Sequence, residues 1–205
     1  SDTRVNVIEG QDRTQPTAVC ICCVFVPDVA FPRVVPDKLQ FFEYDTVSIC
    51  CDETGGDDWR VVRKIRDADT GNRSHWDSSA SSCVTKPALS RHSGEYWCEN
   101  EKGQRGGSVT ITVTDGSVVL ESPARPVLEG TSVTLLCRKR RNASVGISDF
   151  YKDGSLVRTG YRGAMSISNV SLSHDGLYRC HMSGAASPES RLSVKGESKQ
   201  GKSHT

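Results

Sequence analysis

The stretch EGTSVTLLCRK, residues 129–139, decides the fold because its side chains alternate in character and it ends in a cysteine. Successive side chains of a strand point to opposite faces, so Val133, Leu135 and Cys137 share one face. A second stretch, SLSHDGLYRC at residues 171–180, places Tyr178 and Cys180 on one face after an Asp-Gly turn signal. The two inward-facing cysteines predict a disulfide that joins two packed sheets.

The same pattern occurs earlier in the chain. EYDTVSICCDE at residues 43–53 matches the first stretch, with Cys51 in register with Cys137. HSGEYWC at residues 92–98 matches the second, with Cys98 in register with Cys180. A repeat of this kind indicates two copies of one structural unit. The sequence therefore predicts an all-β chain of two tandem immunoglobulin-like β-sandwiches, each with an inter-sheet disulfide.

The predicted order of segments follows from these repeats. It is a signal-like or leader segment at 1–29, a first Ig-like domain at 30–115, a second at 116–195 and a polar tail at 196–205. Residues 18–26, AVCICCVFV, are too short an apolar run to span a bilayer and resemble the core of a signal peptide. The acidic residues before them fit an extra strand or a non-native leader equally well. No long apolar run follows residue 195, so we expect a soluble chain or an ectodomain cut before its anchor.

Composition indicates the compartment and excludes one class of partner. The formal net charge is +1 with 25% charged residues, which argues against a dedicated nucleic-acid binder. Nine cysteines favour disulfides formed in an oxidising compartment. Three glycosylation sequons begin at Asn72, Asn142 and Asn169. We therefore expect an extracellular glycoprotein, at the cell surface or secreted.

Five cysteines remain outside the two predicted inter-sheet bridges: Cys20, Cys22, Cys23, Cys50 and Cys83. Cys50 and Cys83 are candidates for a second bridge in the first domain, since the strands that carry them are neighbours. Aligning Cys83 with Met165 of the second domain points it inward, whereas Cys50 points outward, and this conflicts with that bridge. The cysteines are too closely spaced for a zinc site, and neither a metal nor a cofactor is predicted.

Each sandwich also needs a large side chain beside its disulfide. Trp59, eight residues after Cys51, is predicted to fill this place in the first domain. Phe150 or Tyr151 replaces it in the second. At the corner before the second cysteine, where an aspartate is usual, the chain has His92 and His174. A hydrogen-bonded corner histidine and a pH-sensitive one are both consistent with this pattern.

Several motifs together resemble the two membrane-distal domains of Fc receptors and Fc receptor-like proteins, most like those of bony fish. The resemblance covers about residues 31–195. It rests on SVVLESPARPVLEGTSVTLLCRKR (117–140), FYKDG (150–154), LSHDGLYRC (172–180), GEYWCEN (94–100) and the short joint ITVTDGSVVL (111–120).

The resemblance implies a monomeric receptor that binds immunoglobulin Fc through the second domain and is held at the membrane only by an anchor outside this chain. In that family the contacts come from the domain joint and from loops and a strand of the second domain, here 116–118, 138–148, 156–162 and 181–187. The candidate ligand-binding residues are Gly116, Ser117, Arg138, Lys139, Arg140, Arg141, Ser155, Arg158, Tyr161, His181 and Ser183. The basic run 138–141 could also be a solvated loop flank.

The chain departs from the family at one binding feature. Mammalian Fc receptors hold an antibody proline between two tryptophans, whereas Trp59, Trp76 and Trp97 all lie in the first domain. Two other functions therefore stay open: an adhesion receptor that uses exposed sheet faces, and a receptor for a glycan, lipid or class I-like molecule. The sequence contains no Gly-x-Ser-x-Gly, phosphate-binding or His-Glu-x-x-His motif, so no enzymatic activity is predicted.

Overall fold

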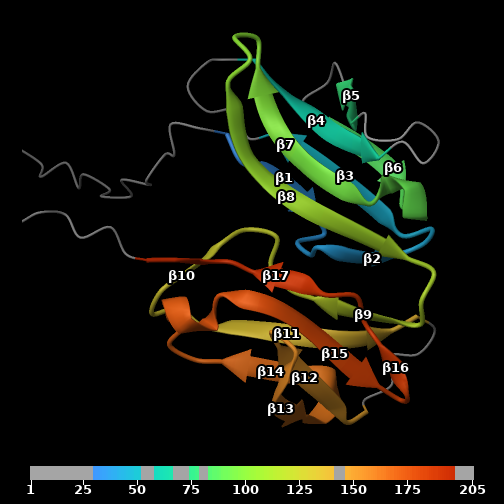
Figure 1. Ribbon diagram of the computed structural model, residues 1–205, viewed down its shortest axis with the longest axis vertical. Coiled ribbons are helices and arrows are strands. Elements are labelled where there is room, and N and C mark those ends of the chain that lie inside the picture. The colour runs from blue at the N-terminus through green and yellow to red at the C-terminus, as the bar shows by residue number, and fades with distance from the viewer. Residues whose placement is uncertain (1–29, 52–57, 67–73, 79–82, 141–145, 197–205) are drawn as a thin grey trace, which may run out of the picture.

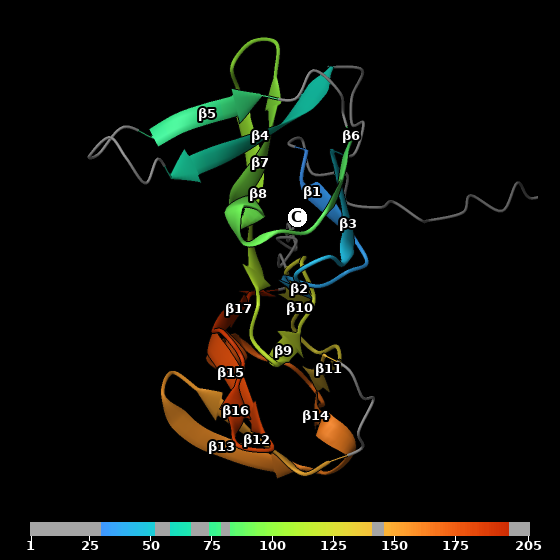
Figure 2. The same ribbon diagram turned by 90° about the vertical axis from the view of Figure 1, so that its right-hand side faces the viewer.

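The protein is described here from a computed structural model, over residues 30–51, 58–66, 74–78, 83–140 and 146–196. The described chain forms two β-sandwiches stacked end to end (Figure 1). Each sandwich consists of two sheets that face each other, which Figure 2 shows from the side. The predicted all-β fold with two immunoglobulin-like sandwiches is thus confirmed.

The first sandwich packs a sheet of order β1-β3-β6 against one of order β2-β8-β7-β4-β5. β2 pairs with β8 in parallel, and the other pairs are antiparallel. The elements are β1 (Pro32–Val35), β2 (Gln40–Phe42), β3 (Thr46–Cys51), β4 (Trp59–Arg66), β5 (Ser74–Ser78), β6 (Cys83–Pro87), the 3₁₀ turn η1 (Ser90–His92), β7 (Gly94–Asn100) and β8 (Arg105–Thr114).

The second sandwich packs a sheet of order β14-β11-β9 against one of order β13-β12-β15-β16, with β17 also paired to β15. A short parallel pair, β10 with β18, lies beside them. The elements are β9 (Val118–Glu121), β10 (Val127–Leu128), β11 (Val133–Lys139), β12 (Ser148–Lys152), β13 (Ser155–Gly160), η2 (Tyr161–Gly163), β14 (Ala164–Ile167), η3 (Leu172–His174), β15 (Gly176–Met182), β16 (Ala185–Ala186), β17 (Ser190–Leu192) and β18 (Val194–Lys195).

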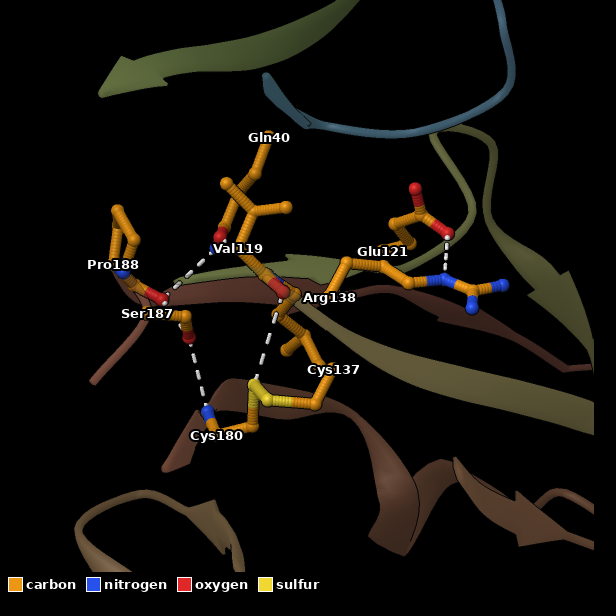
Figure 3. The surroundings of a disulfide bond; sticks show 9 residues. Gln40, Val119, Glu121, Cys137, Arg138, Cys180, Ser187 and Pro188 are labelled. Atoms are coloured by element: carbon orange, nitrogen blue, oxygen red, sulfur yellow. Dashed lines mark hydrogen bonds and ion pairs between the residues drawn. A yellow bond between two sulfur atoms is a disulfide. The ribbon is translucent and has the colours of Figure 1, made fainter. Parts of the chain in front are cut away.

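Both predicted inter-sheet disulfides are present. Cys51 is bonded to Cys98 with a Cα–Cα distance of 5.8 Å, and Cys137 to Cys180 with one of 6.0 Å. Each bridge lies within the apolar core of its own sandwich. Around the second bridge, the Cys180 amide donates to Ser187 Oγ at 3.0 Å, and the Cys180 sulfur lies 3.9 Å from the Val119 carbonyl (Figure 3). The polar groups next to the buried sulfur are therefore paired.

The alignment of Cys83 with Met165 is wrong by one residue. In the second sandwich Met165 pairs with Leu135, whose counterpart in the first is Ile49. Ile49 pairs with Val84, while Cys83 pairs directly with Cys50. Cys50 is disulfide-bonded, and it is buried at 6% exposure although it lies outside the core cluster. Directly paired positions of neighbouring strands share a face, so the predicted conflict with a second bridge disappears.

The large residue beside the disulfide differs between the sandwiches. Phe150, and not Tyr151, fills this place in the second: it is fully buried and pairs with Cys180 across β12 and β15. In the first sandwich Val61 pairs with Cys98, and Trp59 stands two residues away opposite Asn100. Trp59 nevertheless belongs to the same core cluster as the bridge, as predicted.

Both corners before the second cysteine are hydrogen-bonded. Tyr96 donates its hydroxyl to the His92 carbonyl at 2.7 Å, and Tyr178 donates to the His174 carbonyl at 2.9 Å. The Nδ1 atom of His92 accepts the Leu89 amide, and that of His174 accepts an amide in the same way. At His92 an Nδ1 that accepts carries no proton, so the bond from the Leu89 amide requires a neutral ring; the Pro87 carbonyl lies 3.1 Å from the same atom.

We expect His92 to make the first sandwich sensitive to acid. Burial lowers the pKa of His92, and the nearby cations Arg63, Arg91 and Lys86 lower it further. The unfolded chain then binds more protons than the folded one below about pH 6.5, so stability is lost as the pH falls through that value. The variant H92Q keeps an acceptor for the Leu89 amide and does not titrate.

The free energy of unfolding at pH 7.5 and at pH 5 tests this prediction. H92Q should lose less stability between the two pH values than the wild type does. H174Q, at the same corner of the second sandwich, controls for the loss of a corner imidazole in general. An unchanged pH dependence in H92Q would contradict the prediction.

Candidate functional site

The joint between the sandwiches is short and is held by a buried glutamine. β8 ends at Thr114 and β9 begins at Val118, so three residues connect them. Gln40 is fully buried; its Oε1 accepts the Leu120 amide at 2.8 Å, and its Nε2 donates to the Pro188 carbonyl at 2.9 Å. One side chain of the first sandwich thus binds two backbone groups of the second.

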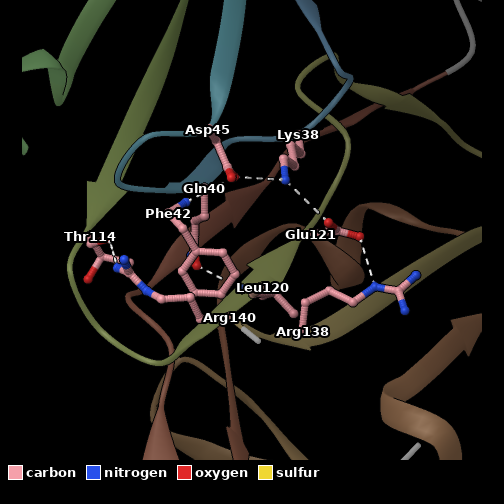
Figure 4. A network of polar contacts seen from close by, with 9 residues as sticks. All are labelled: Lys38, Gln40, Phe42, Asp45, Thr114, Leu120, Glu121, Arg138 and Arg140. Carbon is pink, nitrogen blue, oxygen red and sulfur yellow. Dashed lines mark hydrogen bonds and ion pairs between the residues drawn. The ribbon is translucent and has the colours of Figure 1, made fainter. Parts of the chain in front are cut away.

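Charged side chains continue this contact toward the solvent. Lys38 Nζ lies 3.5 Å from a carboxylate oxygen of Asp45, which is in the same sandwich. It also lies 3.4 Å from a carboxylate oxygen of Glu121, which is in the second sandwich. Arg138 Nε donates to the other oxygen of Glu121 at 3.2 Å (Figure 4). Arg138, a candidate ligand-binding residue, is therefore part of an ion-pair network at the joint.

Arg140 is a second candidate whose partners lie within the protein. Its guanidinium donates to the carbonyls of Thr114 at 2.9 Å and Gly116 at 3.2 Å, and it lies over the Phe42 ring at 5.1 Å (Figure 4). Its backbone amide donates to the Ser117 carbonyl at 3.0 Å. Because these bonds order the connecting segment, a substitution of Arg140 would disturb the joint as well as any ligand contact.

Other candidates gather at the end of the second sandwich next to the joint. Ser148 pairs with both Gly160 and Met182, so Ile147, Tyr161 and Ser183 lie at the same end of this sheet. Lys139, which pairs with Val118 at the start of β9, is exposed at this end too. Tyr161 is 76% exposed and Ile147 is 62% exposed. We call Lys139, Ile147, Tyr161 and Ser183 the joint-proximal surface.

Three candidates lie elsewhere. Ser155 is at the opposite end of the β12–β13 hairpin. Arg158, in the middle of β13, donates to the Ser166 carbonyl at 3.2 Å and so links the edges of the two sheets. His181 lies on β15 and contacts the ring of Tyr151 on β12, with ring centroids 4.9 Å apart. The predicted residues therefore do not form one continuous site.

Several predicted positions lie outside the described residues, but the glycosylation sequon at Asn169 lies within them. Arg141, Asn142, Asn72, Cys20, Cys22 and Cys23 are not described. Asn169 is exposed, with φ of 52°, in the turn after β14. Val170 bonds to Thr131 before β11, so this turn is at the end of the sandwich far from the joint. A glycan on Asn169 would leave the joint-proximal surface free.

Sequence reasoning missed Gln40 and Phe42, and it included Ile147 only within the range 138–148. Gln40 interrupts the apolar run Leu39 to Phe42, and a lone polar residue in such a run is a sign of a buried hydrogen bond. Nothing in the sequence shows that its partners are Leu120 and Pro188, which are distant along the chain. Ile147 follows an undescribed segment and carries no motif.

Comparison with known proteins finds distant relatives across most of the chain. The chain is 28% identical over 158 residues to the mouse low affinity immunoglobulin gamma Fc region receptor II, covering 74% of this chain and 44% of the receptor. It is 25% identical to the rat low affinity immunoglobulin gamma Fc region receptor III, of which it covers 53%. Over 89 residues it is 32% identical to mouse Fc receptor-like protein 5, of which it covers 15%. The chain thus spans about half or less of these relatives.

No protein-family model matches the chain. Solved structures that match the chain include murine CEACAM1b, with a TM-score of 0.33 and 14% identity over 81% of this chain and all of the other. Another contains the four N-terminal Ig domains of Dscam1, with a TM-score of 0.31 and 19% identity over 83% of this chain and 47% of the other. In the part of the chain that the structure describes, no helix has the length and apolar character needed to cross a membrane.

The relatives are receptors and receptor-like proteins, which confirms the prediction that the chain is not an enzyme. The two inter-sheet disulfides agree with this relationship. The chain has an immunoglobulin-like fold and is similar, at 24–28% identity over most of its length, to Fc receptors, and at 32% identity over 89 residues to an Fc receptor-like protein.

Proposed function

We propose that the chain is the extracellular ligand-binding region of an immune receptor and that it binds the Fc region of an immunoglobulin. The observation that carries this proposal is the 158-residue match to an immunoglobulin gamma Fc region receptor, which is long enough to include both sandwiches and their joint. The ligand is then a protein, and the receptor acts at the cell surface or as a secreted form.

The joint-proximal surface is the proposed contact. Tyrosine is among the side chains that contribute most at protein interfaces, and Tyr161 is 76% exposed. Ile147 adds apolar area beside it, at 62% exposure. The backbone below is ordered, since the Gly163 amide donates to the Gly146 carbonyl at 2.9 Å. A rigid apolar and aromatic surface loses little entropy on binding.

This contact differs from the tryptophan pair of mammalian Fc receptors. Trp59 is in the first core, and Trp97 is buried on the outer face of β7 under Arg105, whose guanidinium is 4.4 Å from its ring. At the joint itself, Arg140 covers Phe42. We therefore propose that Tyr161 and Ile147, without a tryptophan pair, supply the apolar contact.

Binding of the glycosylated chain to whole immunoglobulin and to its Fc and Fab fragments tests the proposal. We expect saturable binding to immunoglobulin and to Fc, and none to Fab. Y161A should weaken Fc binding about tenfold or more, as loss of a central aromatic does. L172A removes a side chain that is 57% exposed at the far end of the same sandwich and should have no effect.

Two outcomes would contradict the proposal. One is no binding to any fragment by a chain whose fold is intact. The other is equal binding to Fc and Fab. If Fc binds and Y161A binds as well as the wild type, the ligand is correct and the proposed surface is wrong. N169Q, at the far end from the joint, should bind like the wild type.

A further inference from the structure

The outer face of the β13-β12-β15-β16 sheet carries a block of four side chains. Tyr151 pairs with Arg179, and Asp149 pairs with His181, across β12 and β15. Residues two apart on a strand share a face, so the four lie together on the face opposite Phe150 and Cys180. Figure 2 shows no other described element over this face of the sheet. We call these four residues the outer-face block.

The block holds a cation without an anionic partner. Arg179 lies over the Tyr151 ring at 5.1 Å, and within the described chain no carboxylate pairs with it. Its Nε and the Nε2 atom of His181 are buried yet have no hydrogen-bond partner among the described residues. Arginine and tyrosine are among the side chains that contribute most at protein interfaces, and a guanidinium is attracted to the face of an aromatic ring.

The block also holds an anion that can accept further bonds. Thr159 donates to Asp149 Oδ1 at 2.6 Å, which fixes the carboxylate on the outer face. An ionised carboxylate has several acceptor positions on its two oxygens, so Oδ2 remains able to accept. Arg179 and Asp149 occupy opposite corners of the block. The other diagonal is formed by Tyr151 and His181, whose rings are 4.9 Å apart.

This arrangement is complementary to itself. We propose that the outer-face block is a self-association surface and that its partner is a second copy of this chain. A two-fold axis along the Tyr151–His181 diagonal exchanges the other two corners of the block. It therefore brings Arg179 of each copy against the partner's Asp149, twice in one contact. The block itself carries one positive and one negative charge, so it does not favour a strongly acidic or strongly basic ligand.

Apolar side chains flank the block and would be covered by the same contact. Leu156, opposite Tyr151 on β13, is 57% exposed, and Leu177, two residues before Arg179, is 41% exposed. A charged and aromatic centre with apolar flanks is typical of protein interfaces. The single sheet face is small, so we expect weak, reversible association. This inference departs from the monomer implied by the sequence resemblance and does not depend on Fc binding.

Charge reversal on each side of the pair tests the proposal by sedimentation equilibrium of the glycosylated chain. R179D and D149R each place like charges together, and each should weaken self-association at least tenfold. Mixed in equal amounts, the two variants should associate with each other about as strongly as the wild type does with itself. In the mixed dimer Arg179 meets the native Asp149, and the two introduced residues form the second pair. The unfolding temperature of each variant shows that it is folded.

Any of three results would overturn the proposal. A wild type that is monomeric up to about 1 mM, the range of the weakest specific contacts, would exclude it. So would self-association that neither single variant weakens. Folded single variants whose mixture does not associate would show that Arg179 and Asp149 do not meet across the interface. Y161A, on the joint-proximal surface, should self-associate like the wild type.

Discussion

Replacing Phe150 with alanine is expected to destabilise the second sandwich by about 3–5 kcal/mol, because the change leaves a cavity beside the disulfide. Phe150 is fully buried and pairs with Cys180. The ring packs directly against the backbone of β13 at Gly160, since a Cβ added there would lie 2.9 Å from Phe150 Cε2. This paired strand cannot easily move into the space that the ring leaves. Urea denaturation monitored by circular dichroism measures the loss.

Two further variants separate the cavity from other effects. F150L keeps most of the buried volume and should cost less than F150A. Y151A changes the next residue, which is half-buried on the outer face, and should cost about 1 kcal/mol or less. If F150A and Y151A had equal effects, Phe150 would not be the core residue that the structure indicates.

Local patterns were enough to predict the fold and most of its core. The alternation in residues 129–139 placed Val133, Leu135 and Cys137 inward, and all three belong to the second core cluster. The choice between Phe150 and Tyr151 could not be made from the sequence, because both adjacent residues are aromatic. Only the register of β12 against β15 puts Phe150 beside the bridge.

Register also explains the error at Cys83. A shift of one residue moves a side chain to the other face of a sheet, so an alignment that is wrong by one position reverses its predicted orientation. The segments on both sides of β6 carry no motif that fixes the alignment with the second sandwich. The pairing of Cys83 with Cys50 therefore had to come from the structure.

The candidate site was predicted less well, for a different reason. The basic run 138–141 is visible in the sequence, but the partners of Arg138 and Arg140 are Glu121 and two carbonyls of the joint. Whether a cation faces solvent or another domain depends on how two sandwiches meet, and strand periodicity contains no information about that. The same holds for His181, which was predicted from a loop and lies within β15.

The joint gives the second large prediction. Replacing Gln40 with leucine, which is similar in size, should leave the buried Leu120 amide without a partner and the Pro188 carbonyl with the Ser187 hydroxyl as its remaining donor. An unpaired buried amide costs about 1–3 kcal/mol and the lost bond to Pro188 about 1 kcal/mol, so the expected loss is about 2–4 kcal/mol. The free energy of unfolding measures the total, and hydrogen exchange of the Leu120 amide shows directly whether its bond has been lost.

E121Q is the matched control for Q40L. It weakens the partly exposed network with Lys38 and Arg138, and it should cost less than about 1 kcal/mol because exposed ion pairs contribute little. If Q40L were as stable as the wild type and its Leu120 amide remained protected, the buried glutamine would not hold the joint. Q40L leaves the residues of the joint-proximal surface in place.

If Q40L nevertheless weakens Fc binding, the binding depends on the relative orientation of the two sandwiches that Gln40 fixes. Because the Gln40 bonds are buried, they should keep that orientation at high salt, where the Lys38–Glu121–Arg138 network is screened.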